Sequence, residues 1–104
     1  MQNKGYSREW LDKLIYNSDI VSTISRYLTL TRKGNTYWAC CPFHHEKTPS
    51  FAVNQQGQFY HCFGCGASGN VITFVEKMEG TDFIDTVKML AGWAGMEVPE
   101  FHGD

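Results

Sequence analysis

Two short pairs of potential metal ligands stand in the middle of the chain. Cys41 and His44 form a Cys-x2-His pair, and Cys62 and Cys65 form a Cys-x2-Cys pair. The intervening segment 45–61 is long enough for a β-hairpin that brings the second pair back to the first. Three thiolates and one imidazole complete a tetrahedral zinc set. Because such a set leaves no coordination position for water, we expect one structural zinc ion rather than a hydrolytic one.

Further side chains beside the first pair could also bind a metal. Pairing Cys40 with His44, or Cys41 with His45, would leave three residues between the ligands. The two-residue spacing matches that of the second pair, and it therefore favours Cys41 and His44. We expect Cys40 to be a small buried side chain, as unpaired cysteines usually are, and His45 to be solvated.

The second pair has other possible interpretations, which fit less well. A disulfide framework needs an oxidising compartment, which nothing in the sequence indicates. A redox Cys-x2-Cys motif normally opens a helix, whereas Cys62 follows a short strand-like run. His61 should point to the opposite face of that strand from Cys62, because side chains alternate along a strand.

The elements that must position these ligands follow from the hydrophobic periods. Alternation of apolar and polar residues predicts strands over 27–32, 36–40, 50–54 and 58–61. An apolar spacing of three to four residues predicts helices over 8–16, 71–78 and 82–94, and a further short helix that Asp19 caps. Thr81 is the predicted cap of the helix over 82–94. The fold class is therefore α+β: a zinc ribbon, which is a small antiparallel sheet with the metal at its edge, between N- and C-terminal helices. We expect one domain over 1–104, comprising N-terminal helices in 1–26, the ribbon in 27–66, C-terminal helices in 67–98 and the start of a linker in 99–104.

The charge is unevenly distributed. Residues 1–25, 26–75 and 76–104 carry net charges of 0, +3 and −5, which together give the overall −2. The middle region is thus mildly basic, which suits a short nucleic-acid contact rather than tight duplex binding. No apolar run approaches the length of a membrane span, and the polar start lacks a signal-peptide core, so we expect no membrane association.

Three stretches together resemble a known family. They are 41–44 (Cys-Pro-Phe-His), 46–51 (Glu-Lys-Thr-Pro-Ser-Phe) and 59–66 (Phe-Tyr-His-Cys-Phe-Gly-Cys-Gly). These stretches are similar to the N-terminal zinc-binding domain of bacterial replicative DNA primases of the DnaG type. The resemblance extends from about residue 8 to about residue 99, through 19–21 and 69–74.

The resemblance implies a part of a cytoplasmic bacterial enzyme that makes short RNA primers. This domain would read single-stranded DNA template and cooperate, in cis or in trans, with a separate magnesium-dependent catalytic domain. A further C-terminal region would bind the replicative helicase. We expect the 104-residue chain alone to be non-catalytic, because it offers no carboxylate cluster for two catalytic metals. The alternatives are the zinc module of a phage or plasmid primase-helicase and a zinc ribbon that binds proteins.

Aromatic and basic side chains on the ribbon could contact the template, because bases stack on exposed rings and cations bind phosphates. The candidate contacts are Lys47, Arg32, Lys33, Tyr37, Tyr60 and His61, with Trp38 and Phe59 as further aromatic candidates. Lys47 is favoured because it lies in the family stretch 46–51. Family members commonly have a basic residue after the turn glycine, where this chain has Asn35, so that contact is replaced by Lys33 or lost. Some rings must fill the core instead, and we expect these to be Phe51, Phe59 and one of Tyr37 or Trp38.

Overall fold

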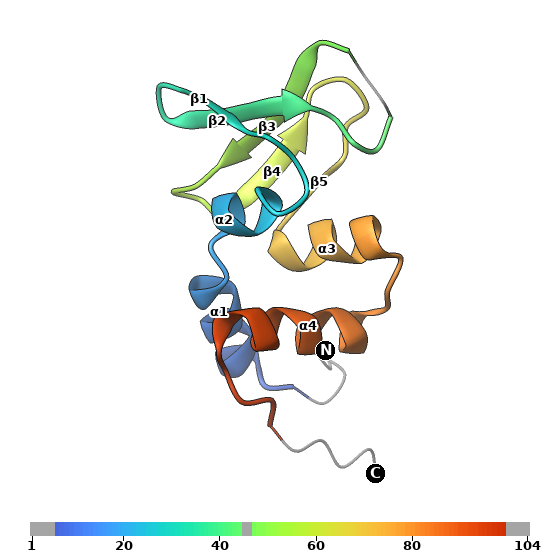
Figure 1. The fold of residues 1–104 in the computed structure, drawn as a ribbon. Helices are drawn as coiled ribbons and strands as arrows, with labels where there is room; N and C mark the ends of the chain where they lie inside the picture. The colour runs from blue at the N-terminus through green and yellow to red at the C-terminus, as the bar shows by residue number, and fades with distance from the viewer. Residues whose placement is uncertain (1–5, 45–46, 100–104) are drawn as a thin grey trace.

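The computed structural model describes residues 6–44 and 47–99. Its elements, in chain order, are α1 (Arg8–Asn17), α2 (Ile20–Ile24), β1 (Thr31–Lys33), β2 (Thr36–Cys40), β3 (Pro49–Asn54), β4 (Phe59–Cys62), β5 (Ser68–Gly69), α3 (Val71–Glu79) and α4 (Phe83–Ala94). Figure 1 shows the sheet at one end of the molecule, with α2 and α3 beneath it and α1 and α4 beyond them. The predicted α+β class, a small antiparallel sheet with helices at both ends, is confirmed.

The five strands form one antiparallel sheet in the order β1-β2-β3-β4-β5. Directly paired residues point to the same face of a sheet, so the register sorts the side chains into two faces. One row runs Arg32, Tyr37, Val53, Tyr60 and belongs to the inner face, toward α2 and α3. The next row runs Lys33, Thr36, Asn54, Phe59 and belongs to the outer face, toward solvent.

The core lies between the inner face and the helices. Phe51 and Tyr60 are fully buried there, and their rings meet Phe74 of α3 with centroids 5.9 and 5.7 Å apart. The same core continues between α1 and α4, where Leu14 and Leu90 are fully buried. Large aromatic side chains bury much apolar area each, which is how so small a sheet is held on its helices.

Polar side chains fix where the helices begin. Ser7, Asp19 and Asn70 accept hydrogen bonds from backbone N–H groups in the first turns of α1, α2 and α3, as N-caps do. The predicted Thr81 cap of α4 is wrong. Asp82 takes that place and accepts from the N–H of Asp85, while the Thr81 hydroxyl meets that of Thr86 at 2.6 Å.

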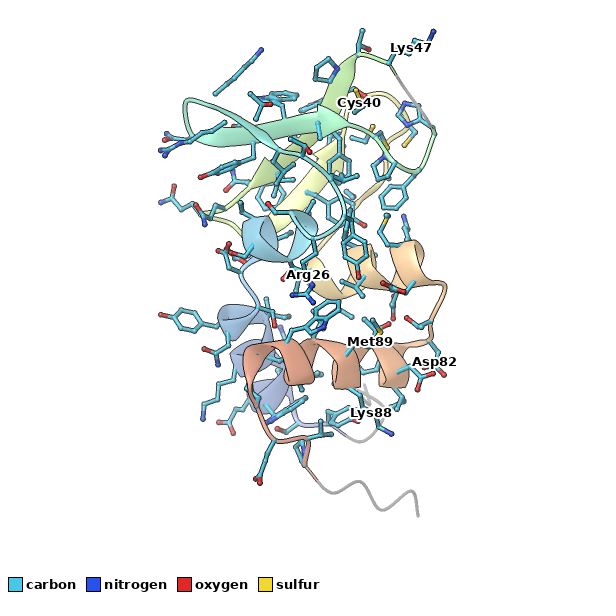
Figure 2. All side chains as sticks on the ribbon, viewed as in Figure 1. Arg26, Cys40, Lys47, Asp82, Lys88 and Met89 are labelled. Atoms are coloured by element: carbon cyan, nitrogen blue, oxygen red, sulfur yellow. The ribbon has the colours of Figure 1, made fainter. Side chains whose placement is uncertain are left out.

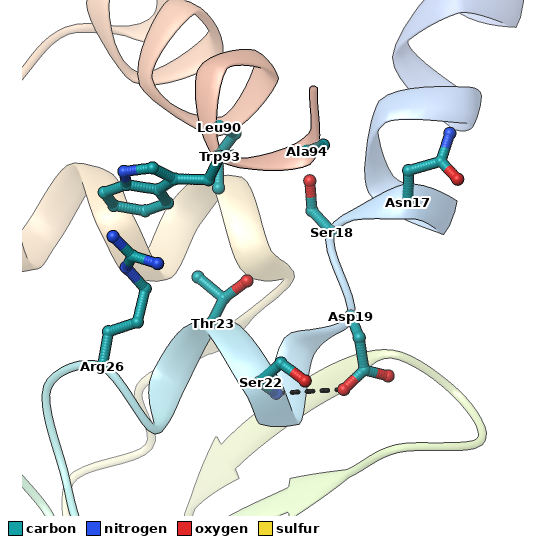
Figure 3. Close-up of a pocket in the computed structure, with 9 residues that line it drawn as sticks. All are labelled: Asn17, Ser18, Asp19, Ser22, Thr23, Arg26, Leu90, Trp93 and Ala94. Carbon is teal, nitrogen blue, oxygen red and sulfur yellow. Dashed lines mark hydrogen bonds between the residues drawn. The ribbon is translucent and has the colours of Figure 1, made fainter. Parts of the chain in front are cut away.

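The β3–β4 turn is tied to α2. The Oε1 atom of Gln58 accepts from the Ile20 N–H at 2.8 Å, and its amide nitrogen donates to Asp19 at 3.1 Å. Figure 3 shows Asp19 beside α2, and Arg26 and Trp93 facing one another across the groove between α2 and α4. The guanidinium lies 3.9 Å from the Trp93 ring centroid. Contacts from both ends of α2 thus fix the sheet relative to α4.

Two segments differ from the predicted elements. The alternating stretch 27–30 was predicted to begin a strand, but the N–H groups of Tyr27 and Leu28 both bond to the carbonyl of Ile24 and continue the turn of α2. The stretch 67–70 was predicted as a loop, but it contains β5, which pairs Ser68 with His61. Both errors arise because backbone hydrogen-bond partners, Ile24 in the first case and His61 in the second, decide these states rather than the local residue types.

Candidate metal centre and outer face of the sheet

The two predicted ligand pairs converge at one end of the sheet. Cys41 comes directly after β2 and His44 stands in the turn that follows, while Cys62 ends β4 and Cys65 lies in the turn toward β5. Their potential ligand atoms all lie within 4.8 Å of one another. Among the residues that the structure describes, this is the one grouping of three or more His, Cys, Asp or Glu side chains compact enough to hold a metal.

The spacing of these atoms fits a tetrahedral zinc ion. With zinc–sulfur bonds of about 2.3 Å, two ligand sulfurs stand about 3.8 Å apart. The Sγ atoms of Cys41 and Cys65 are 3.9 Å apart, and Sγ of Cys62 lies 3.8 Å from Nδ1 of His44. Three sulfurs with one imidazole nitrogen are also the ligand types that zinc prefers.

The second turn is shaped around the cluster. The Gly64 N–H donates to the Cys62 sulfur at 3.3 Å, and the Ser50 hydroxyl lies 3.6 Å from the same sulfur. A Cβ at position 64 would stand 2.8 Å from Nε2 of His44, which is closer than real Cβ atoms approach. Gly64 is therefore required because the imidazole packs directly on its backbone.

Two thiols of the cluster have shifted pKa values. Burial raises the pKa of Cys41 to about 11. Burial also acts to raise the pKa of Cys62, but the N–H groups of Cys65 and Gly64 oppose it. Together with the Ser50 hydroxyl they lower the pKa of Cys62 to about 6. Cys62 is thus prepared as a thiolate, and a bound dication would hold every ligand thiol deprotonated.

Cys40 does not join the cluster. It was predicted to be buried, but its side chain is exposed and its thiol donates to the carbonyl of Lys47 at 3.3 Å. The pairing register shifts between Ala39 and Cys40, and Cys40 pairs with Pro49 at the end of β2, whereas Cys41 lies beyond the strand. His45, the alternative imidazole, lies outside the described residues.

The outer face of the sheet carries a group of aromatic side chains. Trp38 and Phe63 stack with ring centroids 6.0 Å apart, and the His61 ring meets the edge of Phe63 at 4.7 Å. Phe59 is 47% exposed and Phe63 69% exposed. We call Trp38, Phe59, His61 and Phe63 the outer aromatic group. His61 points to the opposite face of β4 from Cys62, as predicted. Its ring lies on the outer face, where it is available to a ligand.

Two of the predicted ring placements are wrong. Tyr60 was a candidate DNA contact, but it is fully buried, and Phe59, predicted to fill the core, is exposed. The cause is alternation along β4, because Cys62 points inward to the cluster and Tyr60 must then point inward too. Tyr37 also belongs to the inner row and packs against the core, so Trp38 is the ring of β2 that faces outward.

The predicted basic contacts separate onto different parts of the sheet. Lys33 pairs with Thr36 in the outer row, and β2 and β3 separate it from Phe59 on β4. Arg32 belongs to the inner row, with its guanidinium 5.9 Å from the Tyr37 ring. Lys47 is exposed, and Figure 2 shows it with Cys40 at the end of the sheet that carries the cluster. Lys33 therefore shares its face of the sheet with the outer aromatic group, whereas Arg32 belongs to the opposite face.

Phe63 was not predicted as a functional residue. It lies between Cys62 and Cys65, and this position is the feature of the sequence that could have identified it. When both cysteines of such a turn point to one ion, the residue between them that follows the first cysteine is directed outward. A large apolar residue at an exposed turn position indicates a contact with a ligand or partner, because its exposure to water is unfavourable.

Comparisons with known proteins agree with this arrangement. The family model described as CHC2 zinc finger matches residues 6–103. A DNA primase from Pasteurella multocida is 48% identical over 101 residues, covering 92% of this chain and 17% of that protein. A DNA primase from Haemophilus influenzae is 52% identical over 92 residues, covering 88% of this chain and 16% of that protein. The chain thus spans about a sixth of the length of these curated relatives.

A solved structure is also similar. The crystal structure of the Aquifex aeolicus primase, comprising its zinc-binding and RNA polymerase domains, matches with a TM-score of 0.81 and 36% sequence identity. The match covers 95% of this chain and 23% of that chain. Within the described residues, none of the helices has the length and apolar character needed to cross a membrane.

Proposed function

The chain belongs to the CHC2 zinc-finger family of bacterial DNA primases, and on that premise we propose that it is the zinc-binding, template-contacting domain of such an enzyme. In this proposal Cys41, His44, Cys62 and Cys65 hold one zinc ion, which closes the end of the sheet. The outer aromatic group then contacts single-stranded template DNA. Residues 27–66 form the ribbon, 1–26 and 67–98 supply the supporting helices, and 99–104 begin the connection to a catalytic domain.

The observation that carries this proposal is the outer aromatic group itself. Exposed rings on a solvent-facing sheet are unfavourable unless a partner covers them. Bases stack on such rings whatever their sequence, and each stacked base is worth about 1–3 kcal/mol. Lys33 on the same face and Lys47 at its end provide cations for the phosphates that accompany the bases. Because the cluster is closed by four ligands, the zinc ion supplies structure and not a reactive water.

The same chemistry supports a second proposal, that template binding and primer synthesis belong to different domains. Since the described residues of this template-holding domain form no carboxylate site for magnesium, the domain would have to present the strand to another domain. We therefore propose a magnesium-dependent catalytic domain, acting in cis or in trans, as the partner that makes the primer. Contact with a replicative helicase is proposed for a region beyond this chain, and the enzyme would act in the bacterial cytoplasm.

A titration of fluorescent single-stranded DNA with the zinc-loaded chain tests the template contact. We expect weak binding whose affinity falls with salt, with a slope of about −0.7 per phosphate contact. Lys33→Gln should weaken binding and lower this slope by about one contact. Arg32→Gln is a matched control, because it removes the same charge from the neighbouring position on the inner row.

Three results would contradict the proposal in different ways. Equal weakening by Lys33→Gln and Arg32→Gln would mean that the outer face is not the binding surface. A Trp38→Ala variant that keeps its zinc and binds DNA as tightly as the wild type would show that base stacking on Trp38 does not contribute to binding. Absence of any binding by the zinc-loaded wild type would favour a zinc ribbon that binds proteins.

A further inference from the structure

The outer face contains a hollow within the aromatic group. It has a volume of about 240 Å³ and is lined by Thr36, Trp38, Ala52, Asn54, Phe59, His61 and Phe63. The register explains why it exists. Ala52 pairs with Trp38 on one side and with His61 on the other, so one small side chain separates two large rings. Ala52 is therefore the floor of the hollow.

The size and the lining of the hollow restrict what it can hold. Pockets for drug-sized ligands measure about 300–1,000 Å³, so this hollow suits a smaller group. Rings on several sides favour a flat group that can stack on them or meet their edges. A single base of a nucleic acid strand has this size and shape, whereas two stacked bases exceed it.

One polar side chain in the hollow has a fixed orientation. Asn54 accepts a hydrogen bond from the Gly57 N–H at 2.7 Å, and only the oxygen of its amide can do so. The amide nitrogen is consequently the end left for a ligand, and it finds no hydrogen-bond partner among the described residues. Asn54 can therefore donate to a base from an amide whose orientation the turn already fixes.

Every base presents an acceptor to such a donor. Adenine offers ring nitrogens, guanine O6 and N7, cytosine O2 and N3, and thymine O2 and O4. The Asn54 amide therefore adds a hydrogen bond to a base seated in the hollow without requiring one particular base.

From these observations, and resting on the proposed template contact, we infer that the hollow over Ala52 receives one unstacked template base and that Asn54 donates a hydrogen bond to it. The neighbouring bases stack on the rim of the outer aromatic group, where recognition is tolerant of sequence. Asn54 thus helps to hold the base, and Ala52 provides the space that the base occupies.

The first experiment tests whether one base enters the hollow. Single-stranded oligonucleotides with one abasic position, moved along the strand, are titrated against the zinc-loaded chain. We expect one position at which base removal weakens binding about 5- to 150-fold, the range for one stacked base. Ala52→Ile fills the floor with a residue that favours strands, and should show the same loss on intact DNA but no sensitivity to the abasic position. Ala52→Ser keeps the space and should behave as the wild type.

The second experiment tests the role of Asn54. Binding by Asn54→Asp and by Gln56→Glu is compared on the intact oligonucleotide and on the one that is abasic at the sensitive position. Asn54→Asp keeps an oxygen for the Gly57 N–H but replaces the donor by an acceptor. It should weaken binding to the intact strand about 2- to 10-fold more than binding to the abasic strand, the value of one hydrogen bond. Gln56→Glu introduces the same charge in the same turn and should weaken binding to both strands equally.

The outcomes separate this inference from the proposed function. If the wild type binds DNA but no single base matters, or Ala52→Ile binds like the wild type, the one-base hollow is wrong. If Asn54→Asp weakens binding to the intact and the abasic strand by the same factor, as Gln56→Glu should, the role of Asn54 is wrong. If the wild type binds no single-stranded DNA at all, both the inference and the template contact fail.

Discussion

Cys40 and Cys41 are neighbours in the chain, yet only one of them reaches the ligand cluster. Cys40, the last residue of β2, is exposed beside Lys47, while the next residue, Cys41, is buried with its sulfur 3.9 Å from that of Cys65. A structural zinc ion takes four ligand atoms, which complete its tetrahedral coordination. The two adjacent thiols should therefore respond very differently to the same substitution.

We predict that Cys62→Ser loses the zinc ion while Cys40→Ser keeps one equivalent. Serine does not replace a thiolate as a zinc ligand under ordinary conditions, whereas Cys40 supplies no ligand. Metal analysis of the purified variants, or their mass under native conditions, measures the ratio. If Cys40→Ser were to lose zinc while Cys41→Ser kept it, the proposed ligand assignment would be wrong by one residue.

At the scale of elements, α2 is short and depends on its surroundings. A helix of five residues has little stability of its own. Asp19 caps it through the Ser22 N–H at 3.0 Å and accepts hydrogen bonds from the amides of Gln55 and Gln58 in the β3–β4 turn. The same carboxylate thus connects the helical layer to the sheet, which positions the turn that carries Asn54.

This connection should make stability depend on pH. Burial acts to raise the pKa of Asp19, but the hydrogen bonds from Ser22, Gln55 and Gln58 outweigh it, so that the pKa is lowered from its usual 3.8. A carboxyl with a lower pKa in the folded state stabilises the fold at pH values above its unfolded pKa. That contribution is lost as the pH falls through the folded pKa.

We predict that Asp19→Ala lowers the free energy of unfolding at pH 7 by about 1 kcal/mol, as loss of an N-cap usually does. The difference between variant and wild type should shrink as the pH falls below the usual 3.8 and through the lowered pKa of the folded-state carboxyl. Urea denaturation of both proteins across this range, with zinc content checked at each pH, measures it. Asp12→Ala, which removes an exposed carboxylate from α1, is the control, and an equal effect of both variants would contradict the prediction.

At the scale of the whole molecule, the cluster and the core support the same sheet. Phe51 and Val53 of β3 are buried against the helices, while the end of the sheet beyond them is joined through the two ligand turns. Zinc binding contributes an apparent free energy of about 10–16 kcal/mol in small zinc domains. That is as large as the total stability of a typical domain, about 5–15 kcal/mol.

We therefore predict that a strong chelator unfolds the sheet. Circular dichroism should lose its strand signal as zinc is removed, and restored zinc should recover it. The near-ultraviolet signal of Trp38 and its stacked neighbour reports the outer face during the same titration. A metal-free chain with an unchanged spectrum and an unchanged denaturation midpoint would show that the helical core alone holds the fold.

We also predict that the purified chain makes no primers from template, nucleotides and magnesium. Apart from the Cys and His cluster, the described residues contain no grouping of three or more possible metal ligands, so no carboxylate set for magnesium is formed by them. The measurement is a gel assay for labelled short RNA, with a primase catalytic domain as the positive control. Primer synthesis by the chain alone would contradict the proposal that a different domain catalyses primer synthesis.

The sequence by itself determined the local chemistry of this protein. Ligand spacing within each pair is a property of a short turn, so Cys41 with His44 and Cys62 with Cys65 could be predicted as two pairs. The caps Ser7 and Asp19, and Gly95 at the end of α4 with a φ of 71°, are local in the same sense. The family resemblance rests on the same stretches, which the comparisons bear out.

Only the tertiary structure decided which face of the sheet is buried. Side chains alternate with a period of two, so a difference of one residue exchanges core and surface. Helices α2 and α3 pack on the face that bears Tyr60 and Arg32, and this leaves Phe59 and Lys33 on the other. The hollow over Ala52 likewise exists only because three strands align there, which no local pattern in the chain could specify.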